Sequence, residues 1–273
     1  HPELYQYVEL LRPALSIFHV YDRMAEYHEP RFAGQPLYEA FHQACRLADD
    51  SVDPTQRVLA HWAGAFACAD AGDRNRLEEH ARILRVCAGR TGIASHRWFT
   101  AHVDALAAMF AGDLDVLEAA VASYLAVGIE VGYEADTIAQ WAPMMITVAQ
   151  FRGTFATLIP SIESARAENP GLPVYAPTLA WALAIEGDLA AARTMLHEAR
   201  VSDFHLPMDL TWLIGQSFWM EVAHRVDDQD AVAVVLDRIE PWGHLMTCCH
   251  TGIAGVGWHY VGRGRFTLRD VDG

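Results

Sequence analysis

Lysine is missing from this sequence of 273 residues, because all 20 basic residues are arginine. A chain without lysine has no lysine nucleophile, no Schiff-base lysine and no phosphate-loop lysine. Arginine in place of lysine is explained either by codon bias in a GC-rich genome or by selection for the planar guanidinium group, and we favour codon bias. The sequence also lacks the Gly-x-Ser-x-Gly, His-Glu-x-x-His and Gly-x-Gly-x-x-Gly motifs. These absences remove the usual sequence signals of several hydrolase, metalloprotease and dinucleotide-binding classes.

Positive charge is scarce as well. The 20 basic residues face 35 acidic ones, so the net charge is −15. This balance opposes binding to nucleic acid, which needs a basic surface, and to anionic membranes. No run of 18 apolar residues occurs, so we expect no membrane span. We therefore expect the protein to bind neither nucleic acid nor a membrane directly.

Cysteine is sparse and irregularly placed. Its number is odd and its spacing forms no disulfide framework, which favours a reducing compartment and predicts a cytoplasmic protein. The five positions are Cys45, Cys68, Cys87, Cys248 and Cys249.

Hydrophobic residues make up 52% of the chain, and they recur at helical spacing in segments separated by similar junctions. The clearest junction is Gly187-Asp188, where an alanine-rich helix should end and an amphipathic helix begin. Related junctions begin at residues 72, 112, 152 and 227, so the spacings are 40, 40, 35 and 40 residues. A period of this size is typical of stacked helical hairpins. We therefore predict an all-α fold, an α-solenoid of about six tetratricopeptide-like hairpins with a period near 40, as a single helical-repeat domain over residues 1–273.

Several individual elements follow from this pattern. We predict an opening helix over residues 4–27, and the clearest hairpin over residues 173–186 and 189–200. Pro143 should bend its helix or mark the true start of that helix. A last apolar helix is expected over residues 245–261, with the pattern dissolving after Gly262. No strands are expected, since strand-like alternation is missing.

Asp49, Asp50 and Asp53 have the spacing of the aspartate-rich magnesium motif of terpene synthases. Such an enzyme needs a second magnesium-binding motif on a facing helix, and the sequence offers none. The alternative is a helix end followed by a turn, with Asp53 capping the next helix before Pro54. We favour this structural interpretation.

His244, Cys248 and Cys249 offer soft metal ligands. On a helix, His244 and Cys248 would be one turn apart, which suits two ligands of one zinc ion. A zinc site needs further ligands, and no second cluster accompanies these residues. We therefore favour a buried polar patch and predict no metal and no cofactor.

Tryptophan is concentrated in the last third of the chain, where Trp181, Trp212, Trp219 and Trp258 occur. These side chains either pack in the core or line a concave groove for a peptide, a domain or a small effector. We give the second interpretation as the candidate binding site, with no catalytic residue.

The segment Ala180–Arg193, with Leu206-Pro207, Trp212-Leu213 and the glycine-rich stretch from Gly255 to Arg263, carries a family resemblance over residues 174–263. It resembles the C-terminal tetratricopeptide-like region of large bacterial regulators with a signalling ATPase module. These include actinobacterial-type LuxR-family transcriptional regulators and proteins associated with class III cyclases. The resemblance implies a sensor or scaffold arm whose ATPase, cyclase or DNA-binding functions lie outside it.

Our leading hypothesis is a non-catalytic regulatory domain, part of a longer multidomain signalling or transcription-regulating protein. It would bind a protein partner, a neighbouring domain of its own chain or a small effector, and neither nucleic acid nor membrane directly. The alternative is an all-α metal-dependent enzyme that uses Asp49, Asp50 and Asp53 or the cluster of His244, Cys248 and Cys249.

Overall fold

The computed structural model describes residues 35–270 of the chain, so the predicted opening helix over residues 4–27 lies outside the described residues. Within this part the protein is mostly helical, with twelve α-helices, and neighbouring helices pack in sequence order. The predicted all-α class is confirmed at this level. Contacts between residues group the chain into two compact units, residues 1–148 with 250–252, and residues 149–249 with 253–273.

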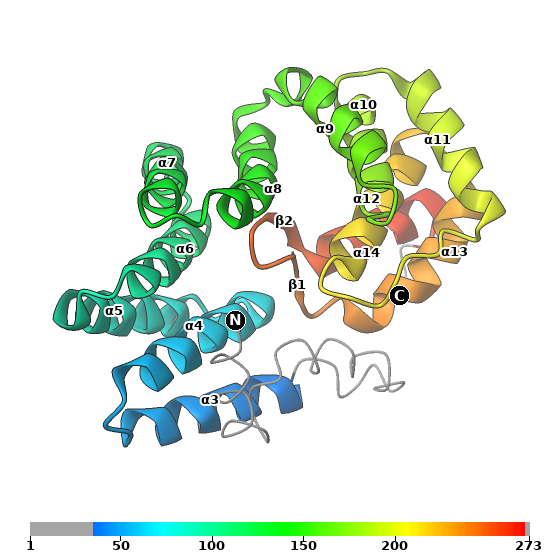
Figure 1. Cartoon of the computed structure of the whole chain (residues 1–273). Helices are drawn as coiled ribbons and strands as arrows, with labels where there is room; N and C mark the ends of the chain where they lie inside the picture. The colour runs from blue at the N-terminus through cyan, green and yellow to red at the C-terminus, as the bar shows by residue number, and fades with distance from the viewer. Residues whose placement is uncertain (1–34, 271–273) are drawn as a thin grey trace. The chain divides into compact units, whose positions relative to one another are not determined.

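The described part of the first unit contains five complete helices and most of a sixth (Figure 1). Each helix from the first to the fourth packs against the next, and the second also contacts the fourth. The six helices are α3 (Gln35–Asp49), α4 (Pro54–Ala71), α5 (Arg74–Thr91), α6 (Ala94–Ala111), α7 (Leu114–Glu130) and α8 (Glu134–Arg152).

The second unit is built around α12, which contacts α10, α11, α13 and α14. Its α-helices are α9 (Ile159–Glu168), α10 (Tyr175–Ile185), α11 (Leu189–Val201), α12 (Trp212–Arg225), α13 (Gln229–Ile239) and α14 (Gly257–Leu268). Two short 3₁₀ helices, η2 (Phe155–Thr157) and η3 (Glu240–Trp242), lie beside α9 and α13.

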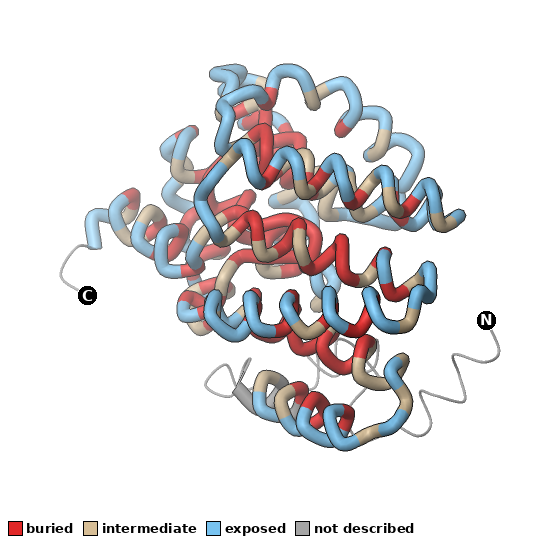
Figure 2. The backbone as a smooth tube through the Cα atoms, turned by 90° about the vertical axis from the view of Figure 1, so that its left-hand side faces the viewer, coloured by how far each residue is buried: buried red, intermediate tan, exposed pale blue. Residues whose placement is uncertain are grey.

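The helices differ in how much of their surface is buried (Figure 2). Helices α4, α6 and α12, which are rich in apolar and small residues, are buried on most sides. Helices α5, α11 and α13 are amphipathic, and they bury one face and expose the other. This division is expected, because a helix that is apolar all round must be covered by its neighbours. All five cysteines lie in buried positions. None of the described helices combines the length and apolar character that a membrane crossing requires.

The junctions between helices have the predicted chemistry. Gly187 adopts φ 91°, in the left-handed region that favours glycine, and the Asp188 carboxylate accepts a hydrogen bond from the Ala191 amide at 3.0 Å. The junctions at Gly72-Asp73 and Gly112-Asp113 repeat this arrangement, with a left-handed glycine and an aspartate cap. Each junction thus satisfies backbone groups that a helix end leaves unpaired.

The predicted helix over residues 245–261 is wrong. Strands β1 (Met246–Cys248) and β2 (Ile253–Val256) form an antiparallel hairpin there, with a bulge between Thr247 and Cys248, so the expectation of no strands is wrong as well. Gly255 has φ 144°, outside the helical range. The Gly257 amide donates to the Leu245 carbonyl at 2.8 Å, and a side chain at Gly257 would collide with this backbone. The chain therefore turns back on itself before α14 begins.

Two further expectations about helix boundaries are corrected. Pro143 does not mark the start of a helix, because it lies inside α8, and the alternative that it bends this helix stays a prediction. The helical pattern also does not dissolve after Gly262, because α14 continues to Leu268. This continuation packs closely on α12, because a Cβ atom at Gly264 would lie only 3.0 Å from the terminal methyl group of Met220.

Candidate functional site: a groove on helices α5 to α7

A groove of about 1050 Å³ runs over α5, α6 and α7 of the first unit. Its floor is the face of α6 that carries residues 100, 101, 104, 107, 108 and 111, which recur at helical spacing. Four of these six residues are alanine, so the floor is low and largely apolar. Small side chains on the central helix thus leave the hollow between its two neighbours.

The groove walls come from α5 and α7. Helix α5 contributes long charged side chains, among them Glu79, Arg82 and Arg85. Helix α7 contributes short residues, among them Ala120 and Ser123. One wall is therefore charged, and the other, which also carries Val116 and Val127, is mostly apolar.

The charges around the groove pair with one another. Arg82 donates to both carboxylate oxygens of Glu79, at 2.9 and 2.6 Å, and Arg85 donates to Asp104 at 2.9 Å. Arg97 forms a two-point contact with Glu130, at 2.9 and 2.8 Å. Three arginines and three acidic residues line the groove, so it is locally neutral on a chain of net charge −15.

Asp104 is the charged residue of the groove floor. Burial raises the pKa of its carboxyl group, and the Arg85 guanidinium opposes this shift. On the exposed wall, hydrogen bonds from Arg82 lower the pKa of Glu79. These pairs outline the groove. Of its floor alanines, Ala111 is exposed and Ala107 half-buried, whereas Ala101 and Ala108 are buried.

The predicted tryptophan site lies in the second unit, where the four side chains have different surroundings. Trp181 is buried and stacks on Phe218 at a ring distance of 4.1 Å. Trp212 and Trp219 are also buried, and each borders a separate hollow, of about 430 and 220 Å³. Trp258 is 53% exposed. A binding role for these four residues stays a prediction.

The aspartate-rich segment is divided between a helix end and a helix start. Asp53 caps α4, because its carboxylate accepts from the Thr55 amide at 2.8 Å, as the structural interpretation expected. Asp50 is exposed after α3. The Asp49 carboxylate oxygen lies 2.7 Å from Arg57 Nε and 3.1 Å from His61 Nε2. Two of the three carboxylates thus already have protein partners.

His244, Cys248 and Cys249 do not lie on one helix. Cys248 ends strand β1 and is buried with Cys249, whereas His244 is exposed in the preceding turn. The helical spacing of His244 and Cys248 that we expected is therefore wrong, because the chain is extended there. Within the described part of the chain, the residues that do bring three potential metal ligands together are Cys45, His61 and His80.

Neither the groove nor this second cluster was predicted from the sequence. The alanine spacing on α6 is a usable signal for the groove, although buried helix contacts produce the same pattern. Cys45, His61 and His80 come from three different helices, and their spacings of 16 and 19 residues match no metal motif that we considered.

Comparison with known proteins adds no family to these observations: no protein-family model, no curated protein and no solved structure matches the chain.

Proposed function

We propose that this chain is a non-catalytic regulatory scaffold, an α-solenoid whose groove on α5 to α7 binds an amphipathic helix of a protein partner. The observation that carries the proposal is the open, alanine-floored groove of about 1050 Å³. Binding of an amphipathic helix in an apolar groove is a recurrent mode of peptide recognition.

The size and chemistry of the groove favour a polypeptide helix over other ligands. Small-molecule pockets typically enclose about 300–1000 Å³ and bury most of their ligand, whereas this groove, of about 1050 Å³, is open rather than enclosed. A helix with small apolar residues toward α6 could approach the alanine floor closely. Polar residues of both signs on its flanks would face the paired charges of α5, which suit neither a polyanion nor a polycation.

A regulatory role rests on the sequence. The resemblance of residues 174–263 to helical arms of bacterial regulators supports a place in a cytoplasmic signalling or transcription-regulating protein. Partner binding would then shift neighbouring domains between a restrained and a released arrangement. We do not propose the metal-dependent enzyme alternative, because Asp53 caps a helix and Asp49 is held by Arg57 and His61.

The test is selection of 16-residue peptides from a random phage-displayed library against the 273-residue chain. We expect the enriched peptides to carry small apolar residues at helical spacing. Ala107→Trp would fill the groove floor and weaken their binding at least about tenfold, the equivalent of roughly 1.4 kcal/mol. Binding is measured by fluorescence anisotropy of the labelled peptides.

Ala122→Trp is the matched control, because Ala122 is exposed on α7 and does not line the groove. This variant should bind the peptides as the unsubstituted chain does, and circular dichroism should show both variants to be helical. The proposal is wrong if no peptide is enriched, or if the enriched peptides bind the Ala107→Trp protein as well as the control.

A further inference from the structure

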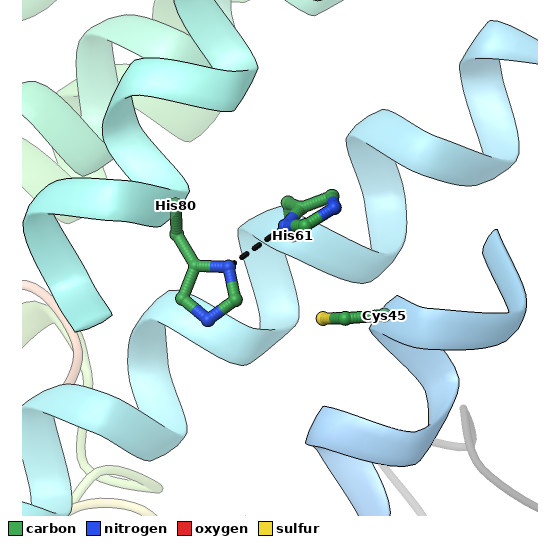
Figure 3. A group of neighbouring side chains, drawn as sticks. All are labelled: Cys45, His61 and His80. Carbon is green, nitrogen blue, oxygen red and sulfur yellow. Dashed lines mark hydrogen bonds between the residues drawn. The ribbon is translucent and has the colours of Figure 1, made fainter. Parts of the chain in front are cut away.

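Three buried side chains with metal-binding atoms meet where α3, α4 and α5 pack together (Figure 3). Cys45 comes from α3, His61 from α4 and His80 from α5, and each is at most 5% exposed. One potential ligand atom from each residue lies within 4.8 Å of the other two. Such a group is unusual in a helical core, where apolar side chains would pack without leaving polar atoms to satisfy.

The hydrogen bonds around His61 fix which ring nitrogen faces the cluster. Its Nε2 lies 3.1 Å from the Asp49 carboxylate, which accepts hydrogen bonds, so Nε2 carries the proton. Its Nδ1 therefore has a lone pair, and this atom lies 2.8 Å from Nδ1 of His80. A carboxylate behind a histidine is the arrangement that orients metal-binding imidazoles in proteins.

His80 has a polar atom that the protein leaves unsatisfied. Because Nδ1 of His61 accepts, Nδ1 of His80 donates the hydrogen bond between them. Its Nε2 is then an acceptor, and this buried atom has no hydrogen-bond partner. A buried polar atom without a partner costs about 1–3 kcal/mol, and a bound cation would remove this penalty.

Gly64 keeps the space between the thiol and the imidazole open. A Cβ atom at this position would lie 2.9 Å from Cys45 Sγ and 3.0 Å from His80 Nε2. Real Cβ atoms essentially never show the first distance, and the second is tighter than most real Cβ contacts. The glycine on α4 thus lets a sulfur and a nitrogen ligand approach one small volume.

The protonation states suit metal binding by the two histidines. Burial lowers the pKa of His80 to about 4, and burial also lowers the pKa of His61, so both imidazoles are neutral near pH 7. Burial raises the pKa of the Cys45 thiol to about 12. A metal ion would displace the thiol proton, which leaves to solvent as the metal–sulfur bond forms.

From these observations we propose that Cys45, His61 and His80 bind one Zn²⁺ ion, with Asp49 orienting His61, and that the ion joins α3 to α4 and α5. One sulfur and two imidazole nitrogens form a ligand set that zinc accepts and that magnesium and calcium disfavour. Three protein ligands leave the fourth tetrahedral position to water. The site is separate from the groove, and it does not depend on the proposed function.

Binding requires the ligand atoms, which lie within 4.8 Å of one another, to move closer together around the ion. Zinc–nitrogen distances of about 2.0–2.1 Å place two nitrogen ligands of a tetrahedral ion about 3.3 Å apart. Binding through His80 Nε2, the acceptor, breaks the 2.8 Å hydrogen bond between the two Nδ1 atoms, because His61 Nδ1 then turns to the ion. Cys45 donates a long hydrogen bond, 3.3 Å, to the Ala60 carbonyl, and this weak contact is lost when the sulfur turns to the ion.

The experiment is a titration of the chelator-treated 273-residue chain with Zn²⁺ and, separately, with Co²⁺ as a spectroscopic probe. We expect one equivalent of either ion to bind, and the cobalt protein to show a thiolate charge-transfer band and tetrahedral d–d bands. Cys45→Ser should abolish the charge-transfer band and lower zinc affinity at least about a hundredfold. Asp49→Asn should lower zinc affinity about 10- to 100-fold, as removal of a carboxylate behind a ligand does.

Cys87→Ser is the matched control, because Cys87 is also 5% exposed but lies outside the cluster. Its zinc affinity and cobalt spectrum should equal those of the unsubstituted chain. If Cys45→Ser does not fold, His80→Gln and Asp49→Asn test the same ligand set. Binding of less than one equivalent, a cobalt spectrum without a thiolate band, or equal losses in the Cys87→Ser protein would overturn the proposal.

Discussion

His102 shows how a single buried residue couples the stability of this protein to pH. It lies on α6 among aromatic rings, including Phe66 and Tyr124 at ring distances of 5.2 Å. Its Nδ1 has no hydrogen-bond partner, and its Nε2 lies 3.3 Å from the His250 carbonyl. Burial lowers its pKa to about 3, and the titratable groups near it are His250 and Tyr124.

The sign of the pH effect follows from this lowered pKa. In the unfolded chain a histidine titrates near pH 6.5, so between pH 6.5 and about 3 the unfolded state binds the extra proton. The stabilisation is complete above pH 6.5 and is lost as the pH falls toward 3. His102→Gln should reduce the pH dependence of the free energy of unfolding by up to about 1.4 kcal/mol per pH unit in this range.

Urea unfolding at pH 7, 6 and 5 measures this change. His197→Gln is the control, because the side chain of His197 is 59% exposed. It should leave the pH dependence as it is in the unsubstituted chain. Equal slopes for the His102→Gln and unsubstituted proteins would show that His102 is not the titrating group.

At the scale of the helix, the packing of α7 against α8 depends on a glycine. A Cβ atom at Gly128 would lie 2.0 Å from Thr137 Oγ1. Thr137 is fully buried, accepts a hydrogen bond from Trp98 Nε1 at 2.8 Å and donates to the Tyr133 carbonyl at 2.6 Å. The threonine cannot move aside without breaking these bonds, so the two helices approach closely only because residue 128 has no side chain.

Gly128→Ala should therefore lower the free energy of unfolding by about 1–3 kcal/mol, the usual cost of overpacking. We expect the opposite effect for Gly89→Ala on α5, since nothing lies within 4 Å of the place that a Cβ atom would take at residue 89. There alanine should stabilise the helix by up to about 1 kcal/mol. Urea midpoints at constant m-value measure both effects, and destabilisation of similar size in the two variants would contradict this packing argument.

The helices and strands also differ in how far the sequence could predict them. The helix junctions were predictable because a left-handed glycine followed by an aspartate cap is local chemistry, present within a few residues at Gly187-Asp188. The β1–β2 hairpin was not, because Gly257 meets the backbone of residues 243 and 245 only in the folded chain. The cluster of Cys45, His61 and His80 was missed for the same reason, since packing of three helices creates it.

For the whole molecule, the net charge of −15 leads to a prediction about nucleic acid. Binding to DNA releases counterions and needs several unpaired basic side chains, whereas the groove arginines Arg82, Arg85 and Arg97 are paired with carboxylates. The chain should not bind a labelled DNA duplex at about 0.15 M salt, measured by fluorescence anisotropy. Binding that weakens as salt is added would contradict this and would favour a nucleic-acid-binding repeat protein.

The burial of every cysteine has a practical consequence at this scale. A thiol reagent in native buffer reaches such a side chain only when its surroundings open, so the alkylation rate reports the frequency of that opening. Local opening of α3, α4 and α5 would be reported by Cys45, Cys68 and Cys87, respectively. Opening of the hairpin region in the other unit would be reported by Cys248 and Cys249. The native cysteines therefore form an internal set of probes for local unfolding, with no engineered label needed.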